Sequence, residues 1–168
     1  MLGKGGIYAD ECLHNGYIGV NFLASHDLNG HLPDDWKPFN KEFIPIFMEE
    51  NVGKTKVAAG LSCGYTWTVC KGLEAGDIVL CPNGRGEYNV GEITGGYYYV
   101  AGTNLCHRRK VRWYDKSIPR AEMSEGLRNS TGSTGTCCDI TKYQAEIDSF
   151  ISATSPVNIV ATSDTIED

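Results

Sequence analysis

The sequence has no apolar stretch long enough to cross a membrane, and its first residues, MLGKGGIYADECLHNG, lack the apolar run of a secretory signal. It also lacks a Cys-x-x-Cys pair and any His/Cys cluster at zinc-finger spacing, and the adjacent Cys137 and Cys138 cannot readily direct both sulfurs at one ion. We therefore expect a cytoplasmic protein without membrane contact, without a metal site and without another cofactor.

Catalytic motifs are missing as well. There is no Gly-x-Ser-x-Gly elbow, and the Gly-Lys-Thr fragment at 53–55 lacks the first glycine of a phosphate loop. The Glu-x-Lys element of restriction-type nucleases is absent, and at Asp115 and Lys116 the intervening residue is missing. The sequence thus shows no catalytic site of its own, and an enzymatic function stays an open alternative.

What the sequence does contain indicates one folded domain. With 168 residues, 41% hydrophobic and 21% charged, the chain can bury one core and is too short for two ordinary domains. Its 20 glycines and 10% aromatics favour a turn-rich α+β or mostly β fold. The seven cysteines are interpreted as reduced, small hydrophobic residues. We place the domain at residues 1–152 and an acidic linker or disordered tail at 153–168.

Charge is unevenly spread along the chain. The formal net charge of −6 argues against a protein that coats nucleic acid by bulk electrostatics. Between residues 108 and 128, however, seven Lys and Arg stand against three acids, and from Glu146 onward every charged residue is acidic. The domain is therefore expected to be polarised, with a basic region available for phosphate contacts.

Apolar periodicity and turn residues predict a mixture of strands and helices. Strands are expected at 16–24, at 75–94 around a turn at 82–84, at 95–100 as a continuation, and at 107–114. Helices are expected at 40–50 with an end or kink near Pro45, at 55–73, at 118–130 with Pro119 in the first turn, and at 141–153. Residues 26–43 are expected to form a long loop carrying Trp36, since Pro33 and Pro38 break regular structure.

Strand alternation divides the segment HRRKVRWY into two faces. Val111 and Trp113 are expected to face the core, and His107 and Arg109 share their side. The cations on the other side would then form a solvated basic stripe: Arg108, Lys110 and Arg112.

Aromatic side chains offer surfaces on which a nucleobase could stack. In the tyrosine triplet, Tyr97 and Tyr99 share one face of a strand and Tyr98 takes the other. An accessible aromatic ring stabilises a stacked base by about 1–3 kcal/mol. Trp36 and Trp67 are further candidates for lining a pocket, and ordinary packing against neighbours is the alternative for each of these rings.

Three segments in a fixed order carry a resemblance to a known family. They are YIGVNF with the following Asp27-Leu28, GLEAGDIVLCPNGRGEYNVGEITGGYYY, and HRRKVRWYDKSIPRAEMSEGLRNSTGS. Over residues 12–152 the chain resembles the EVE-like domains of the PUA superfamily, which are related to YTH domains. Such domains stand at the N-termini of modification-dependent (type IV) restriction endonucleases of the Mcr and Mrr kind, which act in anti-phage defence.

The resemblance implies an α+β fold with a small, curved PUA/EVE-like β-barrel surrounded by helices. It also implies a pocket that takes a base flipped out of a DNA duplex and tests it for modification. The implied partner is double-stranded DNA carrying a modified base, with a nuclease domain or subunit in the full-length protein. The residues expected in the base pocket are Asn21, Phe22, Asp27, Trp36, Trp67 and Tyr98. The residues expected to contact phosphates are Arg108, Lys110, Arg112, Lys54 and Lys56.

Several alternatives stay open at this point. The residues do not decide between 5-methylcytosine, hydroxymethylcytosine and N6-methyladenine as the base that is read. A reader of modified RNA would use the same stacking and phosphate contacts. A protein-interaction module whose pocket is closed is the third possibility.

Overall fold

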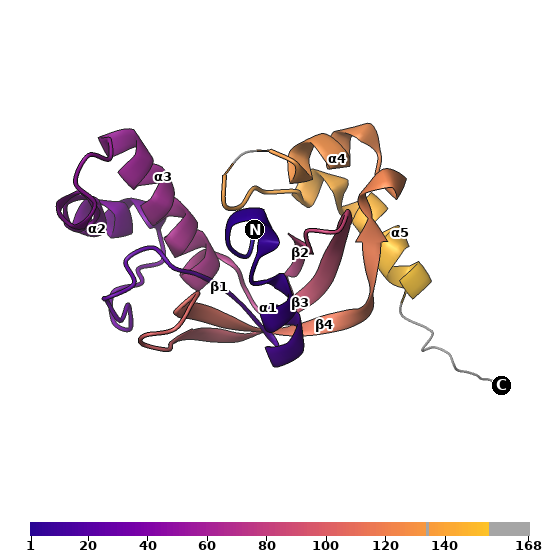
Figure 1. Cartoon of the computed structure of the whole chain (residues 1–168), viewed down its shortest axis with the longest axis horizontal. Helices are drawn as coiled ribbons and strands as arrows, with labels where there is room; N and C mark the ends of the chain where they lie inside the picture. The colour runs from indigo at the N-terminus through magenta and orange to yellow at the C-terminus, as the bar shows by residue number, and fades with distance from the viewer. Residues whose placement is uncertain (134, 155–168) are drawn as a thin grey trace.

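Figure 1 shows the computed structural model, which describes residues 1–133 and 135–154. Apart from residues 153 and 154, the acidic tail predicted over 153–168 lies outside the described residues. In the described part, no helix is both long and apolar enough to pass through a membrane.

A four-stranded antiparallel sheet forms the centre of the domain (Figure 1). The strand order is β1-β4-β3-β2, so β1 and β2 are the edge strands. The register of the β3–β4 pair shifts between Asn89 and Gly91 and again between Ile93 and Tyr97, and such bulges bend a sheet. The predicted α+β class with a small, curved, barrel-like sheet is confirmed. The strands are β1 (Tyr17–Val20), β2 (Ile78–Pro82), β3 (Glu87–Tyr99) and β4 (His107–Pro119).

The two faces of the sheet are covered by different helices. We call the face that carries Arg109 and Val111 the inner face, and the face that carries Lys110 and Arg112 the outer face. Helices α2 and α3 enclose the larger core on the inner face, and α4 and α5 enclose a second core on the outer face, around Ile118. The helices are α1 (Ala9–Asn15), α2 (Trp36–Glu50), α3 (Lys56–Trp67), α4 (Glu125–Thr131) and α5 (Gln144–Thr154). One π-helical segment, η2 (Thr68–Gly72), and three 3₁₀ turns, η1 (Lys4–Gly6), η3 (Arg120–Glu122) and η4 (Thr141–Tyr143), complete the described elements.

Most of the predicted elements are present. The hairpin of β2 and β3, the continuation of β3 through the tyrosines, strand β4, and the helices at α3 and α5 are confirmed. The predicted inner and outer faces of β4 are confirmed too, since Arg109 and Val111 are buried while Lys110 and Arg112 are exposed.

The loop predicted over 26–43 is wrong in its second half, because α2 begins at Trp36 and runs to Glu50 without ending at Pro45. Phe39, Phe43 and Phe47 follow one another at four-residue spacing and are all buried, and this apolar face holds the helix in place. Pro38 lies in the first helical turn, where a missing backbone N–H costs nothing.

The helix predicted at 118–130 begins later than expected. Pro119 ends β4 instead of opening a helix, and α4 starts at Glu125. Ser124 is the N-cap, because its Oγ accepts a hydrogen bond from Leu127 N at 3.2 Å.

The cysteines behave as the sequence predicted. All seven are free, and five are buried. Burial raises the pKa of the thiols of Cys63 and Cys81 to about 11, so both are neutral and pack as small apolar groups.

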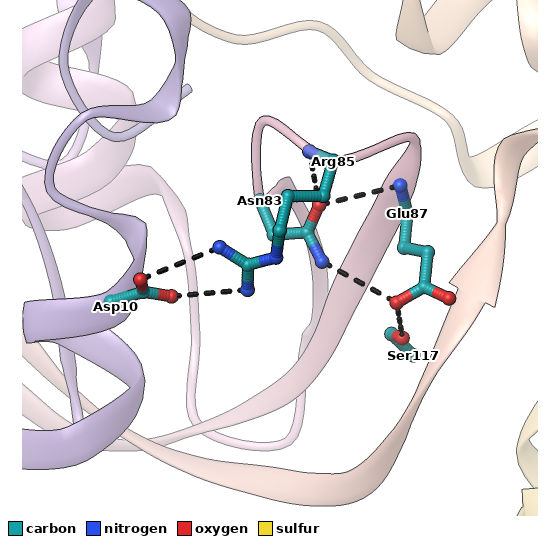
Figure 2. Close-up of polar contacts among 5 residues, drawn as sticks. All are labelled: Asp10, Asn83, Arg85, Glu87 and Ser117. Atoms are coloured by element: carbon teal, nitrogen blue, oxygen red, sulfur yellow. Dashed lines mark hydrogen bonds and ion pairs between the residues drawn. The ribbon is translucent and has the colours of Figure 1, made fainter.

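The turn between β2 and β3 is fixed by side chains (Figure 2). Asn83 Oδ1 accepts hydrogen bonds from the backbone N–H groups of Arg85 at 2.7 Å and Glu87 at 3.3 Å. The Arg85 guanidinium reaches across to Asp10 on α1, with an Nη2–Oδ1 distance of 3.2 Å. Glu87 Oε1 accepts from Ser117 Oγ of β4 at 2.7 Å. These contacts join the hairpin to α1 and β4.

Replacing Asn83 with alanine should lower the free energy of unfolding by about 1–2 kcal/mol, because two backbone N–H groups of the turn lose their buried acceptor. Chemical denaturation followed by circular dichroism measures this change. Arg85→Ala is the matched control, since it removes only the exposed ion pair and should cost less than about 1 kcal/mol. Equal losses in both variants would contradict the role given to Asn83.

Candidate functional site

A groove of about 1230 Å³ follows the free edge of β2. Helices α2 and α3 form one wall, and lining residues from 131–133 and 135–148 form the other; both flank β2 in Figure 1. Most of its surface is apolar, and aromatic rings from three elements contribute to it: Trp36, Tyr65, Trp67 and Tyr88.

The helix wall exposes side chains that ordinarily prefer a core. Val57, Leu61 and Tyr65 succeed one another at four-residue spacing on α3 and line the groove. Val57 is 74% and Leu61 53% exposed, whereas the buried positions of α3 are Ala59, Cys63 and Thr66. The apolar periodicity that predicts this helix therefore marks its groove face and not its core face. An exposed apolar stripe of this kind is typical of a binding surface.

Two tryptophans border the groove on the same side. Trp36 is 47% exposed at the start of α2, with the Lys37 ammonium 5.9 Å from its ring centre. Trp67 is held in place because its Nε1 donates to the backbone oxygen of Pro33 at 2.8 Å. One ring is thus accessible and the other is fixed.

Charge in the groove is mostly negative, although the N-terminal ammonium of Met1, a lining residue, donates to Thr136 O at 2.6 Å. The charged side chains among its lining residues are Asp77, Asp139 and Asp148, and within residues 1–133 and 135–154 neither Lys nor Arg lines it. Lysines stand just outside: Lys37 and Lys56 are exposed and directly adjoin lining residues in sequence. The groove is therefore apolar and acidic inside, with cations at its helical rim.

The six residues predicted for a base pocket do not meet at one place. Trp36 and Trp67 line the groove, while Tyr98 lies on the outer face of the sheet opposite Arg108. The remaining three, Asn21, Phe22 and Asp27, belong to the loop that follows β1 and are not among the groove's lining residues.

The loop residues have contacts of their own. Asn21 Oδ1 accepts a hydrogen bond from Cys106 N at 3.4 Å, and Asp27 Oδ1 accepts from Asn29 N at 3.0 Å. Phe22 packs edge-on against Phe47, with ring centres 6.5 Å apart. These contacts shape the loop and leave the two tryptophans as the aromatic walls of the groove.

The same loop is anchored by a buried histidine that sequence reasoning did not single out as important. His107 Nε2 donates to Leu23 O at 3.0 Å, so Nδ1 is the acceptor for the Tyr97 hydroxyl at 2.8 Å. The Tyr97 oxygen in turn accepts from Leu28 N at 3.0 Å. Burial lowers the pKa of His107, and the neutral ring satisfies both partners. One sign of this structural role is visible in the sequence: strand alternation places His107 on the core face of its strand.

The predicted phosphate contacts divide into two groups. Arg108 lies over the Tyr17 ring, 3.9 Å from its centre, and donates from Nε to Leu105 O at 2.9 Å, while Arg112 pairs with Glu92 at 2.6 Å. These two cations and the exposed Lys110 lie on the outer face of the sheet. Lys54 precedes α3 and Lys56 is its first residue, next in sequence to the lining residue Val57.

Arg109, next to the stripe, has a structural role. Its side chain is buried on the inner face and donates hydrogen bonds to four backbone oxygens of two other segments. The two shortest of these hydrogen bonds are those to Leu73 O at 2.6 Å and to Gly95 O at 2.7 Å. The guanidinium thus satisfies carbonyls at the end of η2 and ties that segment to β3.

Comparison with known proteins gives a family and no functional name. No curated protein and no solved structure matches the chain. One family model matches residues 4–141, which is most of the chain and includes the helix wall of the groove and β2. The chain belongs to the family described as Domain of unknown function (DUF8426).

Proposed function

We propose that this domain binds DNA and takes a modified base into the groove, as the sensing module of a modification-dependent restriction endonuclease. The observation that carries the proposal is the pair of tryptophans, one exposed and one fixed, on one wall of a large apolar groove. A flipped base loses a few kcal/mol of stacking in the duplex, and stacking on aromatic rings returns about 1–3 kcal/mol for each base.

The charges of the groove suit a base better than a phosphate. Carboxylates such as Asp77 and Asp139 accept hydrogen bonds from exocyclic amino groups, which cytosine and adenine carry. The same carboxylates repel phosphates, which are expected to stay at the rim near Lys37, Lys54 and Lys56. Selectivity would therefore reside in the groove, and positioning on the duplex would depend on the lysines.

The proposal is tested with labelled duplexes that contain 5-methylcytosine, hydroxymethylcytosine, N6-methyladenine or no modification. Fluorescence anisotropy should show at least one modified duplex binding more tightly than the plain one. Trp36→Ala should weaken that binding about 5- to 150-fold, which corresponds to about 1–3 kcal/mol of lost stacking. Val52→Ala is the control, because this residue is exposed on the connection between α2 and α3 and does not line the groove.

Two results would refute the proposal. One is equal affinity for modified and plain duplexes, or none for any of them. The other is tighter binding to single-stranded RNA than to duplex DNA, which would make the domain an RNA reader.

A further inference from the structure

The free edge of β2 exposes backbone hydrogen-bonding groups inside the groove. At the two ends of the ladder with β3, Asn83 N donates to Glu87 O and Ile93 N donates to Asp77 O, both at 2.9 Å. The register stays constant between these points, so odd-numbered residues of β2 face β3 and even-numbered residues face away. The N–H and C=O groups of Ile78 and Leu80 therefore point outward, and no partner for them exists in the described part of the chain.

The edge is open over a limited length. At its far end η1 lies against the strand, because a side chain on Gly6 would come within 2.8 Å of Pro82 O. The N-terminal segment adds to this cover, since Met1 and Leu2 line the groove and the Met1 ammonium donates to Thr136 O of the other wall at 2.6 Å. Towards Asp77, β2 borders the groove. The open part is thus centred on Ile78 and Leu80, where four outward backbone groups could pair with three to five residues of an added strand.

The surroundings match the two faces of such a strand. An added strand would extend the sheet, with α3 on the inner side and the lining residues from 131–133 and 135–148 on the outer side (Figure 1). On the inner side it would meet the apolar face of α3, including Leu61 and Tyr65. On the outer side it would meet the carboxylates of Asp139 and Asp148. Because the side chains of a strand alternate between its two sides, one set would meet the apolar face of α3 and the other set would meet the carboxylates.

The edge is also rigid before anything binds. The turn that follows β2 is fixed by Asn83 and by the ion pair between Arg85 and Asp10, as Figure 2 shows. A preorganised strand loses little conformational entropy on pairing, which favours strand addition.

We infer that the open edge of β2 binds an extended peptide segment of a partner protein, with apolar residues alternating with Lys or Arg. This site uses the backbone of Ile78 and Leu80 and is additional to the base site proposed on the tryptophans. Charge selects the occupant: the charged side chains of the groove are three carboxylates, which outnumber the Met1 ammonium, and cationic residues complement them. The chain's own residues 155–168 carry acids and no Lys or Arg, and a second copy would bring two sets of carboxylates together.

The test uses a fluorescein-labelled octapeptide of alternating valine and lysine, with a peptide of alternating valine and glutamate as its counterpart. The Val/Lys peptide should bind, and the Val/Glu peptide should bind at least tenfold more weakly. On binding, the amide protons of Ile78 and Leu80 should become protected from hydrogen exchange, while those of Val79 and Cys81, already paired with β3, should change little.

Leu80→Pro provides the decisive variant. Proline at this position removes only the outward N–H and keeps the ladder to β3, as Pro82 already does at an equivalent position. It should weaken the Val/Lys peptide about five- to tenfold relative to Leu80→Ala, which keeps the N–H. Thermal melting of both variants checks that the fold is retained.

Three outcomes would overturn the inference: equal affinity for the two peptides, equal affinity of Leu80→Pro and Leu80→Ala, or a dimer in light scattering that Leu80→Pro dissociates. The last would make a second copy the occupant. Duplex binding that depends on Trp36 is measured separately, so failure of the peptide test leaves the DNA proposal standing, and the reverse also holds.

Discussion

Replacing Arg109 with methionine should lower the free energy of unfolding by about 3–5 kcal/mol. Methionine fills much of the same volume but leaves the carbonyls of Leu73, Gly95 and Val69 without their donor, in buried or partly buried places. Each unsatisfied buried carbonyl costs about 1–3 kcal/mol. Since domains of this size have only about 5–15 kcal/mol of stability, the variant should melt about 10 °C or more below the wild type.

Two further arginine variants define what is lost. Arg112→Met, on the same strand as Arg109, removes an exposed ion pair with Glu92 of β3 and should cost less than about 1 kcal/mol. Arg109→Lys keeps the charge but not the planar fork, so it should fall between the other two. Denaturation in urea, followed by tryptophan fluorescence and circular dichroism, measures all three. Equal stability of the Arg109 and Arg112 variants would contradict the capping role of Arg109.

Acidification should destabilise the domain through His107. The reference pKa of histidine is 6.5, and burial lowers the pKa of His107 in the fold. Below about pH 6.5 the unfolded chain therefore binds a proton at this position while the folded domain does not. Because the unfolded state binds more protons, stability falls as the pH falls, with a slope of at most about 1.4 kcal/mol per pH unit from this group.

His107→Gln separates this effect from other titrations. Glutamine retains a donor for Leu23 O and an acceptor for the Tyr97 hydroxyl, so the loss at pH 7.5 should be about 1–3 kcal/mol. The difference between wild type and variant should shrink as the pH is lowered from 6.5 to 5. His26 and His31 lie beside Glu50 and Glu42 in both proteins, so their contributions cancel in the difference. A difference that stays constant with pH would contradict a neutral, buried His107.

The local rules of the sequence predicted β4 well. Alternation of polar and apolar residues placed Val111 and Arg109 inside and Lys110 and Arg112 outside, since a strand has only two faces. The glycines and the asparagine near residue 83 predicted the hairpin in the same way. Both features are set by residues close together in the sequence, so the sequence alone predicts them.

The start of α2 and the composition of the site could not be predicted in this way. Pro33 and Pro38 argued for a loop, and Pro45 for a helix end or kink. The four-residue spacing of Phe39, Phe43 and Phe47 outweighed them because all three rings are buried. The predicted base pocket drew on residues from both faces of the sheet. Tyr98 and Trp67 were grouped by residue type, and the sheet separates them.

The sequence by itself determined the elements of this protein: the strands, the amphipathic α3, the reduced cysteines and the division of β4 into a basic and an apolar face. These follow from periodicity and side-chain chemistry within a few residues. Only the tertiary structure decided that the apolar stripe of α3 faces a groove, that β2 is an edge strand, and that Arg109 is a buried cap. Each of these depends on contacts between segments distant in the chain, and such contacts are set by how the layers pack.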